Sequence, residues 1–296
     1  MEKRMNEMKE FQEREVQIAQ QVREADRHAE LVSASHGFYK KVAFTLAEVL
    51  ITLGIIGVVA AMTLPSLIQN YQKKALATQT QKFYSMMSQA VKQYMADYGV
   101  DDLRNTPLAG DNYSGGSYDA GNYISANGEI ESIRDFVTKY LKVVKECEDV
   151  DFDAEGGDNC FAPVYLPFDN SISEEYKFSL FLGKNSTRNY VLADGSVIKI
   201  RYFGYKDAPG PIELYVDVNG KKGPNRVGYD LWEMSIFYDG VIDEGSVTPE
   251  CRKEGDCYWG DTPSYVREVK FDTCQDGGHY GGCFGHLLNN NFKFDY

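Results

Sequence analysis

An apolar run from Val49 to Ile68 constrains this chain more than any other feature of its sequence. Its twenty consecutive residues are uncharged and mostly aliphatic, and about 20 such residues suffice for a helix to cross the hydrocarbon core of a bilayer. This length argues against a buried central helix of a soluble protein. Lys40 and Lys41 precede the run, and a basic flank keeps its own side of a membrane span in the cytoplasm. We therefore expect a single-pass membrane protein with a cytoplasmic N-terminus and an exported C-terminal domain.

One charged residue, Glu48, stands at the start of this apolar segment. The segment Phe44–Ile68 reads FTLAEVLITLGIIGVVAAMTLPSLI. A carboxylate in an apolar span is costly and usually marks a functional pairing. Gly57 and Pro65 are compatible with a membrane helix, because neighbouring helices there satisfy the backbone groups that such residues free.

The order of Phe44, a Thr-Leu pair, Glu48, Gly57 and Pro65 resembles the N-terminal cleavage and methylation segment of type IV prepilins and of type II secretion pseudopilins. The resemblance covers about the first tenth of the mature chain. In that family a prepilin peptidase cuts before the Phe on the cytoplasmic face, the new amine is methylated, and the helix packs into a filament core. Carried over to this chain, the resemblance places the cut between Ala43 and Phe44. The family usually has Gly where Ala43 stands, which implies slower processing.

The resemblance also implies a location and a set of partners. The location is the inner (cytoplasmic) membrane, and the pilus or pseudopilus after assembly. The partners are other pilin or pseudopilin subunits, prepilin peptidase, an inner-membrane assembly platform and membrane lipid. Within the filament, the resemblance makes Glu48 the assembly acid, paired with the amine of Phe44 on a neighbouring subunit. Such a buried pair favours correct register more than stability.

The first 43 residues form a leader that we expect to be removed. Its eight Lys/Arg and eight Asp/Glu residues cancel, and it lacks the apolar core of a secretory signal peptide. Removing 43 of the 296 residues leaves 253, which carry the whole net charge of −13. We expect no nucleic-acid partner, because phosphate binding requires a basic face.

A helical pattern continues beyond Pro65, with apolar residues at three- to four-residue steps or multiples of them. Gly99 is a plausible stop. We expect a transmembrane or filament-core helix over 44–68, its amphipathic continuation over 69–98, and an exported pilin-like domain over 99–296. We also expect Gly57 and Pro65 to bracket a stretch that can lose helical hydrogen bonds on assembly, since proline has no N–H to donate. The apolar positions after Pro65 are Leu76, Phe83, Met87, Val91, Tyr94 and Tyr98.

The domain after the long helix has the patterns of an α+β fold with an antiparallel sheet. A short helix is expected from Ser132, with Asp135 three residues on as a capping-box-like partner, and its apolar stripe extends to Val144. Asp194-Gly195 predicts a two-residue hairpin turn. The last 45 residues look like loops held by two disulfides. The expected strands are Tyr176–Leu182, Tyr190–Ala193, Ser196–Tyr202, a half-buried Ile212–Val218, and Trp232–Ile236.

Residues 109–128 are rich in Gly, Asn, Ser and Tyr without an apolar period, so they are expected to form a long surface loop. Loops carry function more often than cores do. Tyr113, Tyr118 and Tyr123 are therefore candidates for stacking on a partner or a sugar, although exposed loop tyrosines are also common without such a role.

Six cysteines remain after the leader, and all fall on the exported side. They contain no C-x-x-C pair and their spacings do not fit zinc sites, so disulfides in an oxidising compartment are expected. Among the fifteen possible connectivities, we favour neighbours in sequence. The expected bridges are Cys147–Cys160, Cys251–Cys257 and Cys274–Cys283.

A second candidate site is the segment Asp217–Asp230, in which Asp217, Asn219, Asn225 and Asp230 carry oxygen atoms. Calcium takes six to eight oxygen ligands, and some pseudopilins carry a calcium site in a late loop. The spacing is not that of an EF-hand. Asn-Gly and Gly-Pro-Asn also form turns without any ion, so calcium and plain turn chemistry both remain open, and no cofactor is required.

The expected function is structural. The chain has no nucleophile elbow, no His-Glu-x-x-His and no phosphate loop, and we expect no enzyme activity. The resemblance implies a subunit of a type IV pilus or a type II secretion pseudopilus, and the size of the chain favours a minor or specialised one. The alternative is a membrane-anchored extracytoplasmic binding module that does not polymerise and binds a ligand through its Tyr-rich and calcium-like loops.

Overall fold

A computed structural model of the chain describes residues 45–109, 127–147, 160–169, 187–202, 212–257, 262–276 and 281–296. The chain divides into two compact units, Met1–Leu64 and Pro65–Tyr296. Helix α2 (Leu46–Tyr98) provides the described part of the first unit and continues through Pro65 into the second. The expected leader and the residues of the expected cut, Ala43 and Phe44, lie outside the described residues.

After Pro65, helix α2 is amphipathic. The apolar side chains Leu76, Phe83, Met87, Val91 and Tyr94 are all buried, which confirms the helical pattern expected from the sequence. Tyr98, the last residue of that pattern, is instead 47% exposed.

The C-terminal end of α2 is a Schellman motif. The N–H of Gly99 donates to the carbonyl oxygen of Ala96, and the N–H of Val100 donates to that of Met95, both at 3.1 Å. Gly99 has φ +66°, a backbone conformation that glycine adopts without a Cβ clash. The expected stop at Gly99 is therefore confirmed.

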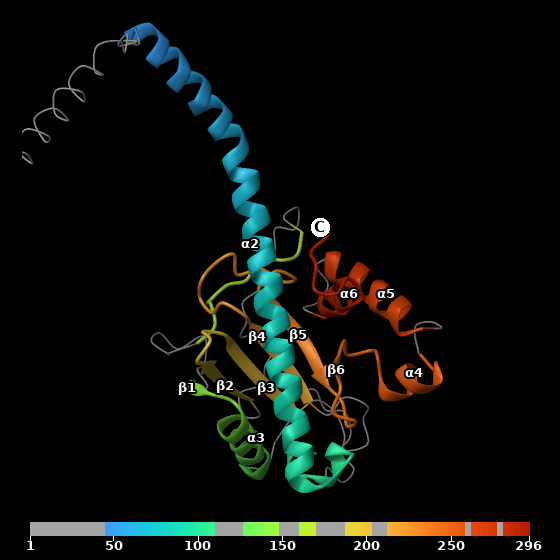
Figure 1. Cartoon of the computed structure of the whole chain (residues 1–296). Helices are drawn as coiled ribbons and strands as arrows, with labels where there is room; N and C mark the ends of the chain where they lie inside the picture. The colour runs from blue at the N-terminus through green and yellow to red at the C-terminus, as the bar shows by residue number, and fades with distance from the viewer. Residues whose placement is uncertain are drawn as a thin grey trace, which may run out of the picture. The chain divides into compact units, whose positions relative to one another are not determined.

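Six strands form one antiparallel sheet in sequence order, and the part of α2 that follows Pro65 crosses one face of it (Figure 1). Cross-strand register aligns Ile198, Val216 and Trp232 in one row of this sheet. All three are buried in the same hydrophobic core as α2. The strands are β1 (Val143–Cys147), β2 (Thr187–Leu192), β3 (Val197–Tyr202), β4 (Ile212–Asp217), β5 (Leu231–Ile236) and β6 (Ile242–Asp243).

Strand β4 is buried on both faces, so the expectation of a half-buried strand was wrong. All six of its residues are buried, including Glu213, Tyr215 and Asp217. The alternating polar residues make internal hydrogen bonds: the Tyr215 hydroxyl donates to Glu213 Oε2 at 3.1 Å. The alternation of apolar and polar residues along β4 therefore reflects a buried row of polar side chains and not a solvent-exposed face of the sheet.

The hairpin between β2 and β3 is confirmed, but its turn is longer than expected. The strands end at Leu192 and begin again at Val197, so Asp194-Gly195 lies within a four-residue connection. The N–H of Leu192 donates to the Ser196 carbonyl at 2.9 Å, and Asp194 accepts hydrogen bonds from the N–H and hydroxyl of Ser196. These hydrogen bonds between Asp194 and Ser196 favour the four-residue connection over the expected two-residue turn.

Helix α3 (Asn127–Tyr140) begins earlier and ends earlier than the sequence suggested. Ser132 therefore lies inside the helix and does not open it. Val144, assigned to the helix stripe, lies in β1 and is 69% exposed. The β-branched pair Val143-Val144 suits a strand better than a helix, and β1 pairs with β2.

The last 45 residues contain helices, which corrects the expectation of loops. The described elements are the second half of α4 (Pro249–Glu254), α5 (Pro263–Gln275) and α6 (Cys283–Asn289). Helices α4 and α5 start alike: a Thr hydroxyl accepts from a backbone N–H three residues on, and Pro follows the Thr. Thr-Pro is a recognised helix start, so Thr248-Pro249 and Thr262-Pro263 were readable signals that the sequence analysis missed.

Three disulfides link the cysteines, and they join the neighbouring pairs expected from the sequence. The Cα–Cα distances are 6.1 Å for Cys147–Cys160, 4.4 Å for Cys251–Cys257 and 5.5 Å for Cys274–Cys283. Two other expectations fall outside the described residues: the strand Tyr176–Leu182 and most of the loop over 109–128, including Tyr113, Tyr118 and Tyr123.

Candidate functional site

Glu48 caps the N-terminus of its own helix. Its Oε2 accepts hydrogen bonds from the N–H of Thr45 at 2.9 Å and from the Thr45 hydroxyl at 2.8 Å. In return, the N–H of Glu48 donates to the Thr45 hydroxyl oxygen at 3.2 Å. This is a capping box, which the Thr-x-x-Glu spacing signals and which the sequence analysis did not identify. A carboxylate here also lies favourably at the positive end of the helix dipole.

The helix that follows Glu48 presents apolar side chains all around. From Leu46 to Leu64 its large apolar side chains are 41% to 81% exposed. By length and composition this helix can cross a membrane, and it is the only such helix in the part of the chain that the structure describes. An apolar surface of this extent requires lipid or other protein around it.

Gly57 and Pro65 lie within the continuous helix. A Cβ added at Gly57 would meet no other atom within 4 Å, so Gly57 is not required by packing within the described chain. Pro65 has no N–H to donate, which leaves one carbonyl of the preceding turn without its helical donor. The boundary between the two compact units falls at this proline. The expected loss of helical hydrogen bonds between Gly57 and Pro65 remains a prediction.

The second candidate site is the β4–β5 connection, where the structure places the predicted oxygen donors together. Asp217 and Asp230 are fully buried. Asp217 Oδ1 accepts from the N–H of Asn219 at 3.1 Å, and Asp230 Oδ2 accepts from the N–H of Asn225 at 2.7 Å. In addition to burial, the negative charge of Asp230 raises the pKa of Asp217. The Asn219 side chain forms a hydrogen bond with the Asp230 carboxylate. One loop thus gathers four predicted residues around two buried carboxyls.

Two observations at this loop fit a hard cation. The Oδ1 atoms of Asn219 and Asn225 are buried and accept no hydrogen bond from the described residues. Burial raises the pKa of both Asp217 and Asp230, because two neighbouring carboxylates are costly to ionise away from water. Calcium prefers such oxygen donors and would neutralise these charges. The four side chains supply fewer than its six to eight oxygens, so backbone carbonyls or water must complete the shell.

Tyr165 joins this loop from a segment 52 residues earlier. Its hydroxyl donates to Asp217 Oδ2 at 2.6 Å and accepts from the N–H of Ala162 at 3.2 Å. The same segment pairs with the loop through its backbone: the N–H of Leu166 donates to the Asn225 carbonyl at 2.8 Å. Burial, and then the charge of Asp217, raise the pKa of Tyr165. No local sequence pattern indicated that Tyr165 would contact the loop.

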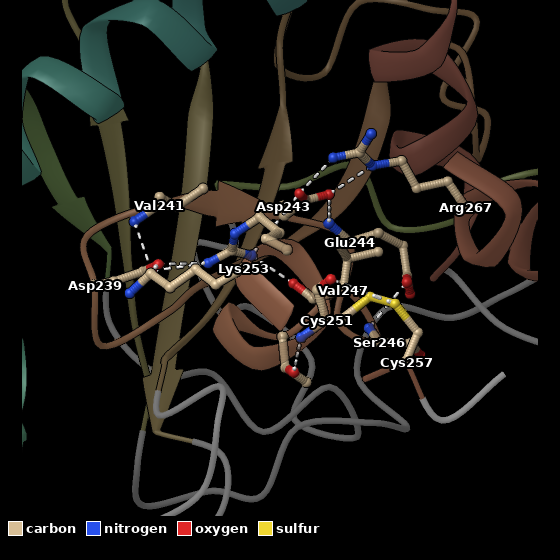
Figure 2. A network of polar contacts seen from close by, with 12 residues as sticks. Asp239, Val241, Asp243, Glu244, Ser246, Val247, Cys251, Lys253, Cys257 and Arg267 are labelled. Atoms are coloured by element: carbon tan, nitrogen blue, oxygen red, sulfur yellow. Dashed lines mark hydrogen bonds and ion pairs between the residues drawn. A yellow bond between two sulfur atoms is a disulfide. The ribbon is translucent and has the colours of Figure 1, made fainter. Parts of the chain in front are cut away.

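A second polar network ties helices α4 and α5 to the end of the sheet (Figure 2). Arg252 of α4 binds both carboxylate oxygens of Asp239, at 2.8 and 3.0 Å. Arg267 of α5 binds both oxygens of Asp243, at 2.9 and 2.6 Å. Asp243 is buried and also accepts from the N–H of Glu244 at 2.8 Å. These paired and satisfied charges indicate a structural role.

Glu244, next in this network, gives a pH-dependent prediction. Burial raises its pKa from 4.5 to about 7, so the folded state holds this proton more tightly than the unfolded chain. The Glu244 contribution to stability is therefore lost as pH rises from about 4.5 to about 7. Glu244→Gln keeps an acceptor for the Ser246 N–H, which donates to Oε2 at 2.9 Å. The variant should exceed the native Tm by about 5 °C at pH 8 and match it at pH 4.

Thermal unfolding of the full chain in detergent, followed by circular dichroism over this pH range, measures the effect. A difference between the two proteins that is constant with pH would rule out titration of Glu244 as its cause.

His286 of helix α6 links helix α5 to the last residues of the chain. Its Nδ1 contacts Glu268 Oε2 at 2.6 Å and its Nε2 contacts Asp295 Oδ1 at 2.8 Å. Its ring stacks on Phe271 with centroids 3.8 Å apart.

Within the described ranges, no group of three or more His, Cys, Asp or Glu side chains is placed to hold a metal ion. The Asp217 loop has two such acids, and its remaining oxygen donors are asparagines.

Comparison with models of protein families gives a match to part of the chain. A model described as a family of unknown function (DUF6613) matches residues 66–208. The matched 143 of 296 residues begin directly after Pro65 and extend from the amphipathic part of α2 beyond β3. No curated protein and no solved structure matches the chain. The family description assigns no activity.

Proposed function

We propose that this chain is a structural subunit of a type IV pilus or a type II secretion pseudopilus. It is matured by prepilin peptidase cleavage before Phe44 and N-methylation, and assembled through the first part of α2. One observation carries the proposal: a single uninterrupted helix exposes an apolar surface whose one charge, Glu48, stands at its start. Lipid covers that surface before assembly, and the helices of other copies cover it afterwards.

The charge on Glu48 separates this proposal from a plain membrane anchor. The capping box with Thr45 explains why residue 48 accepts hydrogen bonds. The capping box does not by itself require a charge, because Gln also serves in it, and the helix dipole favours a carboxylate there by only about 0.3–1 kcal/mol. A charge in apolar surroundings is costly unless it is paired. The amine of Phe44 on a neighbouring subunit supplies such a partner in the filament core.

Shearing of cells and collection of filaments tests this function. The mature chain, which begins at Phe44, is expected in the sheared, pelleted filament fraction together with other subunits of the filament. The alternative, a membrane-anchored binding module that does not polymerise, predicts that all of the chain stays in the membrane fraction. Recovery only in membranes, under conditions where filaments of the host are present, would contradict the proposal.

We also propose that the loop of Asp217, Asn219, Asn225 and Asp230 holds a calcium ion. The buried Oδ1 atoms of Asn219 and Asn225 without hydrogen-bond donors support this proposal, as do the two adjacent buried carboxyls. The ion would brace the β4–β5 connection and, through Asp217, the segment that carries Tyr165. This role is structural and fits either a filament subunit or the alternative binding module.

A further inference from the structure

The apolar run of helix α2 ends close to the point where the helix first contacts the folded domain. The run ends at Ile68, which belongs to the compact unit that begins at Pro65. Five residues further along the helix, Lys73 donates to the carbonyl oxygen of Tyr296 and its Nζ lies 6.0 Å from the centroid of the Tyr229 ring (Figure 1). These contacts begin about 7.5 Å beyond Ile68 along the helix axis. The headgroup layer extends about 5–8 Å beyond the hydrocarbon core, so this end of the domain lies at the headgroups when the apolar run spans a bilayer.

Segments far apart in the sequence meet at this end of the domain. The Arg226 guanidinium lies 5.5 Å from the centroid of the same Tyr229 ring. Leu166 pairs with Arg226 through a parallel backbone bridge, and the Tyr296 hydroxyl donates to the carbonyl oxygen of Gly228 at 2.6 Å. We call the side chains gathered here the base of the domain. They are Tyr71, Lys73, Lys74, Leu166, Arg226 and Tyr229.

The base is basic, although the domain as a whole is acidic. Of the 44 acidic and 31 basic residues of the chain, 10 and 12 precede Gly99, which leaves 34 and 19 and a net charge of −15. In the segments that meet at the base, six basic and two acidic residues are exposed or half-buried, and the other two acids, Asp217 and Asp230, are buried. An anionic surface therefore attracts this end of the domain and repels the rest. The segments are 65–76, 160–169, 217–230 and 292–296; the six basic residues are Lys73, Lys74, Lys221, Lys222, Arg226 and Lys293, and the two acidic ones are Asp169 and Asp295.

The exposed side chains of the base are of the kinds found at membrane interfaces. Tyr71 is 74% exposed and Leu166 is 38% exposed. Lys74 is exposed and forms no ion pair within the described part of the chain. Tyrosine is enriched at the membrane–water interface, and Lys and Arg are attracted to anionic headgroups within a Debye length, about 8 Å at physiological salt.

The other end of strand β5 provides an internal comparison. β5 follows the Asp217–Asp230 loop and ends at Ile236, and the turn that contains Val241 then leads into β6. A Cβ added at Gly240 in this turn would clash with the sulfur of Met95, so the turn packs on α2 about 40 Å beyond Ile68 along the axis. Val241 is 36% exposed, which is close to the value for Leu166. These two apolar side chains therefore mark opposite ends of the domain.

We propose that the base of the domain is a docking surface for anionic phospholipid headgroups in the leaflet from which α2 emerges. Lys73, Lys74 and Arg226 attract the headgroup phosphates, while Tyr71 and Leu166 enter the interfacial layer. The inference requires only that α2 crosses a membrane, so it holds for a filament subunit before assembly and for the anchored binding module. It goes beyond the proposed function because it assigns a lipid contact to the β4–β5 connection and to the segment of Leu166.

Photo-crosslinking of the full chain in vesicles of defined composition tests the inference. One set of vesicles contains phosphatidylcholine alone, and the other contains phosphatidylcholine mixed with phosphatidylglycerol. A photoreactive residue replaces Leu166, or Val241 as the matched control position. We expect lipid adducts from position 166, about tenfold more in the anionic vesicles, and none from position 241. A tenfold difference converts to about 1.4 kcal/mol, the order of magnitude that basic residues contribute near an anionic surface.

Removal of charge tests the assigned residues. Lys74→Gln with Arg226→Gln should lower the yield in anionic vesicles to that in phosphatidylcholine. Arg226→Lys should keep the high yield, which separates the charge from the packing of Arg226 on Tyr229. The matched control, Lys82→Gln with Lys92→Gln, removes two exposed charges from the same helix at about 21 and 36 Å beyond Ile68. It should leave the yield unchanged.

The outcomes separate this inference from the proposed function. Equal lipid labelling in the two kinds of vesicle, equal labelling from positions 166 and 241, or adducts from position 166 only to protein in host membranes would overturn the inference. Flotation of the vesicles shows first whether the chain is inserted. If the chain floats and the labelling fails, this inference alone is wrong. If the chain does not float, the membrane anchorage that the proposed function requires is wrong as well.

Discussion

A full-length Glu48→Gln chain is expected to insert into the membrane at the native level and to fall more than about tenfold in sheared filaments. The substitution removes the charge but keeps an acceptor for the N–H and hydroxyl of Thr45, so the capping box is preserved. What is lost is the partner of the neighbouring Phe44 amine. Leaving one member of a buried ion pair without its partner costs about 3–5 kcal/mol, which accounts for the size of the expected loss.

Thr45→Ala is the matched control for this experiment. It removes the capping hydroxyl and leaves the Glu48 charge in place, at a cost of about 0.5–2 kcal/mol at the helix end. We expect this variant to assemble. Immunoblots of membrane and sheared fractions, for both variants and for Glu48→Ala, give the comparison. Normal assembly of Glu48→Gln together with failure of Thr45→Ala would show that residue 48 acts only as a helix cap.

Calcium is expected to raise the Tm of the full chain by about 5 °C or more when its concentration is about a hundredfold above Kd. At that ratio, binding to the folded state alone contributes about 2.7 kcal/mol, and each kcal/mol shifts the Tm of a domain of this size by about 2–4 °C. Asp230→Asn should abolish the shift, because Asp230 is one of the two buried carboxyls of the loop.

Asp272→Asn on helix α5 is the control, since Asp272 is exposed and lies outside the loop. Differential scanning calorimetry after chelation and after calcium addition measures the shift, and titration calorimetry measures binding directly. If the native chain shows no calcium-dependent shift, or if Asp230→Asn retains it, the Asp217 loop is an ordinary turn with buried carboxyls.

Local signals in the sequence predicted much of the fold. The stop of α2 depends on one glycine with positive φ. The core side of α2 follows from helical spacing, and the disulfides join cysteines close in sequence. The proximity of the oxygen-bearing residues of the β4–β5 connection was predictable, because Asp217 ends β4 and Asp230 directly precedes the adjacent strand β5.

Other features depend on contacts that the sequence does not display. The Tyr165–Asp217 hydrogen bond joins residues 52 positions apart. The burial of both faces of β4 depends on what covers the sheet, so its alternating pattern misled the prediction of a solvent face. Two features did have local signals in the sequence that were not used. Thr-Pro marks the starts of helices α4 and α5, and Thr-x-x-Glu marks the capping box at Thr45.

The most direct test of the proposed maturation is the N-terminus and intact mass of the chain extracted from membranes of its host. We predict a chain that begins at N-methylated Phe44. Its three disulfides remove two hydrogens each, so its mass should be six hydrogens below the fully reduced value. A chain that keeps the leader before Phe44 would contradict prepilin-type maturation, and with it the pairing of Glu48 with a neighbouring amine.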